Sequence, residues 1–175
     1  MQITETDIPG AFLIKPKFIE DERGYFARAY CQEEFAARGI DFLPVQCNLS
    51  YNKSAYTLRG MHYHASAYAE TKLVRCSSGR MFDVAVDLRE GSPTYKKWIG
   101  IELSRKNGCA LFIPAGCAHG FLTLEDDTEV FYQMSPAYVP GHECGFRWNS
   151  PEIGIDWPSE PRVISKKDQA LDDLK

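Results

Sequence analysis

Apolar residues recur along the chain in short runs that alternate with polar or small residues. In residues 82–88, Phe82, Val84 and Val86 fall on one face, and Asp83 and Asp87 fall on the other, mostly polar face. A period of two residues predicts a β-strand. Similar runs, separated by Gly, Pro and Asp, predict strands at residues 11–14, 45–50, 57–63, 71–76, 81–88, 97–103, 110–113, 120–124 and 129–134.

The pattern predicts one short helix, at residues 32–38, which Gly39 would end. Many short strands with a single helix favour an all-β protein, an antiparallel β-sandwich or barrel. We find no βαβ rhythm, no phosphate-binding glycine loop, no repeat and no linker, so we expect a single domain over residues 1–175. The charged tail after residue 158 could be a frayed end or a segment folded back over the barrel.

The chain carries 20 Lys and Arg against 24 Asp and Glu, a net charge of −4, and 44% of its residues are hydrophobic. These values are typical of a globular protein and argue against one that coats nucleic acid or an anionic membrane. They leave room for a small anionic ligand held by a few local cations. We find no secretory signal, no apolar run near the roughly 20 residues of a membrane helix, and no Cys-x-x-Cys spacing. We therefore expect a cytoplasmic protein.

A histidine pair on one predicted strand is the first candidate for chemistry. His62 and His64 lie two residues apart, so both side chains should point to the same side. His119 closes residues 108–119, whose Gly-x5-Pro-x-Gly-x2-His spacing resembles the second signature motif of the cupin superfamily of small β-barrels. With Glu70, these histidines could bind Fe, Mn, Ni or Zn, because imidazole and carboxylate ligands suit all of these metals. A metal-dependent cupin enzyme is therefore one hypothesis.

A second hypothesis depends on six segments in order along the chain: Arg-Gly-Met-His-Tyr at 59–63, Lys-Leu-Val-Arg at 72–75, Phe-Asp-Val-Ala-Val-Asp-Leu-Arg at 82–89, Ile-Pro-x-Gly-x-Ala-His-Gly-Phe at 113–121, Glu-Val-Phe-Tyr at 129–132 and Gly-Ile-Asp-Trp-Pro at 154–158. Together they resemble the dTDP-4-dehydrorhamnose 3,5-epimerase family, nucleotide-sugar epimerases of the cupin superfamily. The resemblance runs from about residue 10 to about residue 168.

This resemblance implies a cupin jelly roll, a metal-free reaction without a cofactor, and a nucleotide-diphosphate sugar as substrate. It also implies a homodimer whose subunits contribute to each other's site. The best-known member acts on dTDP-4-dehydro-6-deoxyglucose in rhamnose synthesis. The expected setting is therefore deoxysugar and polysaccharide biosynthesis, such as that of a lipopolysaccharide O-antigen.

Epimerisation beside a carbonyl group needs a base, a group that holds the enolate oxygen, and an acid on the opposite face. The resemblance implies that His62 is the base and that Asp168 pairs with its other ring nitrogen. It further implies that Lys72 stabilises the enolate at O4 and that Tyr132 returns the proton. Because a phenol is a weak acid in water, we expect nearby cations to favour the Tyr132 anion.

Substrate-binding positions are implied by the same resemblance. Arg23 and Arg59 would contact the diphosphate, since the guanidinium group binds phosphate through two bonds. His119 would contact a sugar hydroxyl or the enolate, and Tyr138 could stack on the base or flank the sugar. The other expected substrate contacts are Arg28, Gln46, Asn48, Glu143 and Lys167.

Three residues depart from the family's usual pattern. Arg28 stands in place of a Glu, His64 in place of a Gln, and Cys47 in place of an Asp. Arg can only donate hydrogen bonds, whereas Glu accepts them, so Arg28 could mark a branch with a different substrate. The nucleotide (dTDP, CDP or GDP) and the epimerised carbon (C3, C5 or both) stay open. A carbohydrate-binding barrel without catalysis is disfavoured, because competent residues fill the base, acid and cation positions.

Overall fold

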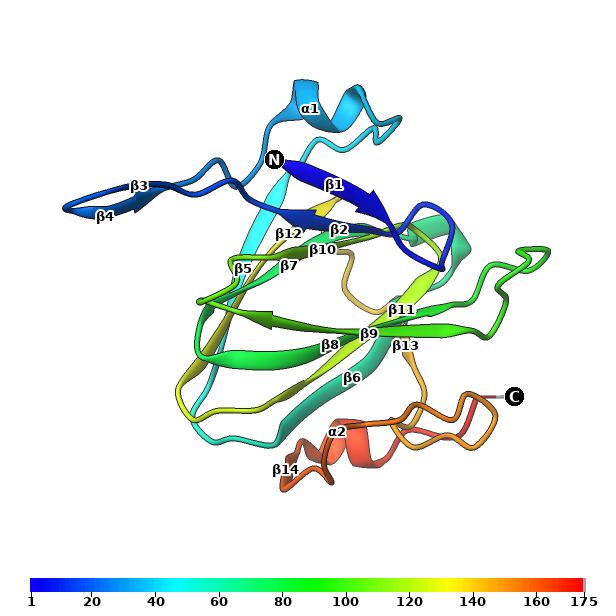
Figure 1. The fold of residues 1–175 in the computed structure, drawn as a ribbon. Coiled ribbons are helices and arrows are strands. Elements are labelled where there is room, and N and C mark those ends of the chain that lie inside the picture. Colours follow the sequence, from blue (N-terminus) through cyan, green and yellow to red (C-terminus); the bar gives the residue numbers. More distant parts are fainter. Residues whose placement is uncertain (175) are drawn as a thin grey trace.

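Two facing antiparallel sheets form a jelly roll, shown in Figure 1 for the computed structural model, which describes residues 1–174. The first sheet has the strand order β1-β2-β10-β7-β12-β5 and consists of β1 (Gln2–Glu5), β2 (Phe12–Lys15), β5 (Gln46–Asn52), β7 (Thr71–Ser78), β10 (Ala110–Ile113) and β12 (Thr128–Ser135). The second has the order β13-β6-β11-β8-β9 and consists of β6 (Thr57–His64), β8 (Arg80–Asp87), β9 (Trp98–Ser104), β11 (Cys117–Thr123) and β13 (Glu143–Gly145).

The remaining elements lie outside this sandwich. A hairpin formed by β3 (Ile19–Asp21) and β4 (Gly24–Phe26) projects away from the body of the molecule (Figure 1). The short helices are α1 (Gln32–Ala36), the 3₁₀ turn η1 (Ser66–Tyr68) and α2 (Lys166–Gln169). The two-residue strand β14 (Val163–Ile164) runs parallel to β6 and brings the C-terminal segment back against the second sheet.

The all-β fold and every strand predicted from the alternating pattern are confirmed. β11 begins at Cys117 rather than at Gly120, which places His119 on a strand. The predicted helix is present as α1, and Gly39 follows it with φ of +74°. The pattern did not reveal β1, β3, β4, β13, β14 or α2, and the tail is the folded-back segment rather than the frayed end. Within residues 1–174 no helix is long and apolar enough to cross a membrane.

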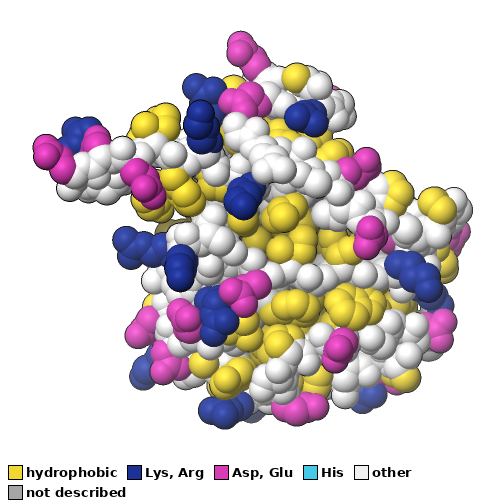
Figure 2. All heavy atoms as spheres, in the orientation of Figure 1, with side chains coloured by type: hydrophobic (Ala, Val, Ile, Leu, Met, Phe, Trp, Pro, Cys, Tyr) yellow, Lys and Arg dark blue, Asp and Glu magenta, His cyan; other side chains and the backbone are white. Residues whose placement is uncertain are grey.

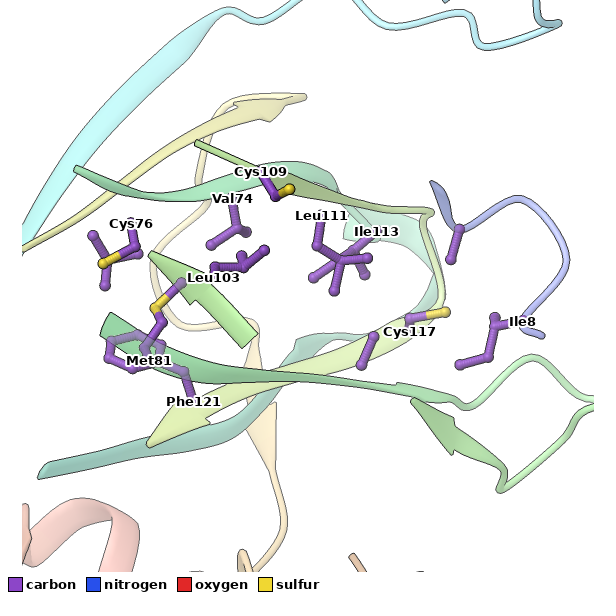
Figure 3. Close-up of a cluster of buried hydrophobic side chains, with 13 residues drawn as sticks. Ile8, Val74, Cys76, Met81, Leu103, Cys109, Leu111, Ile113, Cys117 and Phe121 are labelled. Atoms are coloured by element: carbon purple, nitrogen blue, oxygen red, sulfur yellow. The ribbon is translucent and has the colours of Figure 1, made fainter. Parts of the chain in front are cut away.

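The main core lies between the two sheets (Figure 3). Val74 and Leu111 come from the first sheet, and Met81, Leu103 and Phe121 come from the second. All five are buried, because alternate residues of each strand point into the space between the sheets. This packing fixes the distance between the sheets, and with it the width of any cavity at their open end.

Both faces of β8 are buried, including the face that carries its acidic residues. Val84 and Val86 pack outward against Phe146, in a cluster that the C-terminal part of the chain covers. Asp83 and Asp87 are fully buried on the other face, which they share with the core residues of that strand. The mostly polar face of this segment is therefore the interior one, and each buried carboxylate must find a partner there.

The close approach of β6 and β11 shapes the middle of the second sheet. His62 pairs with His119 and Arg59 pairs with Phe121, so three steps along β6 face two steps along β11. This is a β-bulge, which re-aims the residues that follow it. Gly60 lies in the bulge with φ of +122°, and a Cβ atom there would lie 2.6 Å from the Cα atom of Gly120.

We predict that Gly60→Ala lowers the free energy of unfolding by about 3 kcal/mol, because backbone strain and overpacking add. Gly91→Ala is the matched control, since Gly91 has φ of +84° but no atom within 4 Å of a built Cβ. The control should lose about 1 kcal/mol, the cost of the left-handed backbone alone. Urea unfolding measures both values, and equal losses would contradict the proposed clash at Gly60.

Candidate active site

A cavity of about 890 Å³ opens between the sheets, with walls from β5, β7 and β12 on one side and from β6 and β11 on the other. The C-terminal segment closes part of it through residues of β14 and α2. The four predicted catalytic residues all line this cavity, namely His62, Lys72, Tyr132 and Asp168. Most of the predicted binding residues do so too: Gln46, Asn48, Arg59, His119, Tyr138, Glu143 and Lys167.

The bulge in β6 explains how one strand supplies so many of these residues. Regular alternation would put Arg59 and His62 on opposite faces, because they are three positions apart. The extra residue at the bulge shifts the phase, so that Arg59, His62 and His64 all line the cavity. The expectation that His62 and His64 share one side is thereby confirmed.

His62 and Asp168 form a tight pair at the cavity wall. Nε2 of His62 lies 2.7 Å from Oδ1 of Asp168, whose side chain is buried while 40% of the His62 side chain stays exposed. The short helix α2 holds the carboxylate in place, since the backbone N–H of Asp168 donates to Oγ of Ser165. The N–H of Gly60 also donates to Oδ2 of Asp168, at 3.4 Å.

The surroundings of Asp168 favour its charged form. Burial raises the pKa of this carboxyl group, but the hydrogen bond and charge of His62, with the contacts from Gly60 and Ser165, outweigh burial and lower it. The carboxylate must therefore accept a proton-bearing nitrogen, which assigns the hydrogen to Nε2 of His62. When the ring is neutral, Nδ1 is then the nitrogen with the free electron pair, which can accept a proton.

A second imidazole–carboxylate pair lies next to the first. Nε2 of His119 lies 2.7 Å from Oδ1 of the fully buried Asp83, and His119 is the cross-strand neighbour of His62. Sequence reasoning had assigned no role to Asp83. A signal for Asp83 was its position on an alternating strand, because that position faces the interior of the protein.

Lys72 and Tyr132 enter the cavity from neighbouring strands of the first sheet. Nζ of Lys72 lies 2.8 Å from Oε1 of the buried Glu70. Burial raises the pKa of the Tyr132 hydroxyl, the charge of Glu70 raises it further, and Arg59 opposes them only in part. The expectation that nearby cations favour the Tyr132 anion is wrong, because burial and a carboxylate dominate. Tyr132 is a neutral phenol that can donate its proton.

The cations at the mouth of the cavity differ in their partners. Arg59 donates to Oδ1 of Asn52 at 2.8 Å and to the carbonyl of Tyr51, both uncharged groups. Among the described residues neither Arg59 nor Lys167 forms an ion pair with a carboxylate within 4 Å. Two positive charges are therefore available to an anionic group of a ligand.

Amide groups of β5 and a tyrosine line the adjoining wall. Nε2 of Gln46 donates to Oδ1 of Asn48 at 3.1 Å, and the backbone N–H of Tyr138 donates to Oε1 of Gln46 at 3.0 Å. These bonds fix the two amides and anchor the loop that carries Tyr138. The Tyr138 ring also packs edge-on against the ring of His64, at 5.4 Å between centroids.

Two predicted binding residues do not reach the cavity of their own chain. Arg23 lies on the projecting hairpin, in an exposed ion pair with Asp21. Arg28 follows that hairpin and lies 2.7 Å from Glu34. Their distance from the cavity follows from the hairpin, which extends into solvent instead of packing on the sandwich (Figure 1).

The four residues of the metal hypothesis are not assembled into one cluster. His62 pairs with Asp168 and His119 pairs with Asp83, while His64 lies beside Glu70. Within residues 1–174 no three His, Cys, Asp or Glu side chains come together in a way that could hold a metal ion.

A basic imidazole, a neutral phenol and a lysine therefore face one cavity whose mouth carries cations without carboxylate partners. This combination defines an enzyme that moves protons on a small, anionic organic substrate.

Comparison with known proteins gives the family. The family model for dTDP-4-dehydrorhamnose 3,5-epimerase matches residues 5–175. A dTDP-4-dehydrorhamnose 3,5-epimerase of Sinorhizobium fredii is 44% identical over 163 residues, which cover 93% of this chain and 84% of the relative. The chain belongs to this family, as its motifs predicted, and it is an isomerase of the epimerase type.

Solved structures agree in fold over nearly the whole chain. The dTDP-4-dehydrorhamnose 3,5-epimerase of Bacillus anthracis, solved with TDP and PPi bound, matches with a TM-score of 0.95 and 39% identity, over 99% of both chains. ChmJ, a 3'-monoepimerase of Streptomyces bikiniensis solved with dTDP-quinovose, matches with a TM-score of 0.90 and 31% identity, over 97% of this chain and 86% of that one. The predicted cupin jelly roll is thereby confirmed.

The Asp168 pair predicts a pH-dependent contribution to stability. Because the folded pKa of Asp168 lies below its ordinary value, its stabilisation is complete above the unfolded pKa of about 3.9 and is lost as the pH falls through the folded pKa. The difference in unfolding free energy between the native chain and Asp168→Asn should be largest near pH 6 and shrink below about pH 4. Chemical unfolding across this range measures it.

Asp172→Asn, which removes an exposed carboxylate from the same tail, is the matched control. A difference for Asp168→Asn that stayed constant down to pH 2 would contradict the assignment of a charged carboxylate to this pair.

Proposed function

We propose that this protein epimerises a dTDP-linked 4-keto-6-deoxy sugar at carbons adjacent to its carbonyl group, in deoxysugar biosynthesis. The observation that carries the proposal is the placement of the base and the acid on opposing sheets. His62 belongs to β6 of the second sheet and Tyr132 to β12 of the first, and both line one cavity. A sugar ring between them would present one face to each group, as inversion at carbon requires.

The proton transfers follow from this arrangement. Nδ1 of His62 removes the proton next to the carbonyl group, and Asp168 stabilises the resulting imidazolium ion. The electron pair of the broken C–H bond moves onto O4, where the ammonium group of Lys72 stabilises the enolate. His119 contacts a sugar hydroxyl, since its Nε2 atom faces Asp83 and Nδ1 is left to accept a hydrogen bond. Tyr132 then donates its phenolic proton to the opposite face of the same carbon. Exchange with solvent returns both groups to their starting protonation states.

Substrate binding draws on the cations and amides around the cavity. Arg59 and Lys167 bind the diphosphate, since neither forms an ion pair with a carboxylate among residues 1–174. Gln46 and Asn48 bind hydroxyl or carbonyl groups, Glu143 accepts a hydrogen bond from a hydroxyl group, and Tyr138 flanks the sugar or the base. The solved relatives support dTDP as the nucleotide, because one was solved with TDP and another with dTDP-quinovose.

Isotope exchange tests the roles of base and acid separately. In D₂O, His62→Ala should lose both turnover and deuterium uptake at C3 and C5, because no group removes the proton. Tyr132→Phe should lose turnover by about a thousand-fold but keep deuterium uptake at one carbon, because His62 can still remove a proton and return a deuteron to the same face. NMR of the recovered dTDP-4-keto-6-deoxy sugar measures uptake at each carbon and identifies the epimerised centre.

The matched controls are His142→Ala and Tyr95→Phe, which change the same residue types outside the cavity. Both controls should turn over as the native chain does. Binding of dTDP, measured by calorimetry, should be retained in His62→Ala and Tyr132→Phe. Unchanged turnover in His62→Ala would contradict the proposed mechanism.

We further propose that the active form is a homodimer in which the hairpin of one subunit completes the cavity of the other. Figure 2 shows charged side chains gathered at the tip of the projecting hairpin, with apolar side chains behind them. Phe26 on this hairpin is 70% exposed, and Leu49 on the edge strand β5 is 66% exposed although it lines the cavity. A second copy would cover both surfaces and would bring Arg23 and Arg28 to the neighbouring diphosphate.

Mixing two variants tests this exchange. His62→Ala and Arg23→Ala should each be weakly active alone at low substrate concentration. After unfolding and refolding an equimolar mixture, half of the dimers are mixed, and each contains one intact site. Activity should therefore recover to about one quarter of the native value. Recovery would fail if Arg23 acted on its own chain, and a monomer in sedimentation experiments would also contradict the proposal.

We propose a cytoplasmic location, supported by the six cysteines, all of which have free thiols in the structure.

A further inference from the structure

A buried carboxylate lies behind the proposed enolate-stabilising lysine. Glu70 is only 8% exposed, and its Oε1 atom lies 2.8 Å from Nζ of Lys72. The same oxygen lies 3.3 Å from Nδ1 of His64, which is 7% exposed. All three side chains line the cavity, so this cluster connects the last residue of β6 with the start of β7 at the cavity wall.

His64 is an unusual member of this cluster. Neither of its ring nitrogens forms a hydrogen bond among the described residues, although both are buried, and the Glu70 contact has ion-pair distance without hydrogen-bond geometry. Leaving buried polar atoms without hydrogen bonds costs stability, so such atoms call for an explanation. The ring packs edge-on against Tyr138, and its Nδ1 atom lies 3.3 Å from the Glu70 carboxylate.

Glu70 acts on one group of the proposed mechanism. It holds the ammonium group of Lys72 directly. A lysine side chain has four rotatable bonds, so an ammonium group without a partner would sample many positions in a cavity of this size. Fixing Nζ before the substrate arrives removes that cost from the reaction.

We infer that Glu70 and His64 form a positioning pair for Lys72, in which Glu70 fixes the ammonium group and His64 holds the Glu70 carboxylate in place. This inference rests on the role given to Lys72 in the proposed function. In this inference, neither Glu70 nor His64 contacts the reacting atoms. This inference also gives a role to His64, whose imidazole reaches the buried carboxylate from the end of β6.

A double-mutant cycle tests whether Glu70 acts through Lys72. Glu70→Gln keeps the size of the side chain and removes its charge, and should lower kcat about ten-fold while the affinity for dTDP stays native. In a Lys72→Met background, Glu70→Gln should cause no further loss of kcat, because the group that it positions is gone. Losses that multiply in the double variant, or native kcat in Glu70→Gln, would overturn the inference.

Glu129→Gln is the matched control, because Glu129 is a half-buried carboxylate of the first sheet that accepts a hydrogen bond from Ser77 outside the cavity. It should leave kcat unchanged. Native kcat in Lys72→Met would instead show that Lys72 has no role in the reaction, which is a failure of the proposed function and is distinguishable from additive losses.

Two variants of His64 test the other half of the pair. His64→Leu fills the space but cannot interact with the carboxylate, and should lower kcat several-fold with native dTDP affinity. His64→Gln supplies an amide N–H that can donate to Glu70, and should restore most of that loss. Equal kcat in both variants would overturn the role of His64. Thermal unfolding of each variant identifies any loss that reflects folding rather than positioning.

Discussion

The contact between Asp168 and β6 joins the end of the chain to the middle of the second sheet. The Asp168 carboxylate accepts hydrogen bonds from Nε2 of His62 and from the backbone N–H of Gly60. Asp168 belongs to the four-residue helix α2, which is too short to be stable alone. The helix therefore depends on the sheet for its position, and the imidazole depends on the helix for its tautomer. Folding of the tail and assembly of the site are in this sense one event.

Two packed sheets are well suited to chemistry that needs opposite faces of one molecule. The core between the sheets sets their separation, and the cavity is the part of that space that apolar side chains do not fill. A strand on either side can then supply a group to either face of a flat substrate, as His62 and Tyr132 do. Rigid strands hold such groups more accurately than loops would.

The alternation of apolar and polar residues predicts the long strands, but it does not predict the short C-terminal segments that complete the site. Strands with alternating apolar residues show a period of two, so β8 and β12 are visible in the sequence. β14 and α2 have two and four residues, too few to show any period, and their conformation is imposed by contact with β6. Asp168 could be placed in the site only by family resemblance, because nothing in the charged tail distinguishes it from its neighbours.

The electrostatics of the site were the hardest part to predict. Sequence position cannot show that burial and the charge of Glu70 outweigh the charge of Arg59 at Tyr132, so the predicted direction of its pKa shift is wrong. Asp83 was missed for a related reason, since an acidic residue on an alternating strand is normally expected to face water. Arg23 and Arg28 were placed in the site from family resemblance, but one chain does not bring them there.

The bulge in β6 determines which residues of this strand face the cavity. Arg59 lies before the extra residue and His62 after it, and both face the cavity only because the phase of the strand changes between them. A regular strand of the same length would turn His62 away from the cavity and Met61 toward it. Surface loops of this protein can change length during evolution, whereas an insertion or deletion in β6 outside the bulge would exchange the inward and outward faces of the residues beyond it.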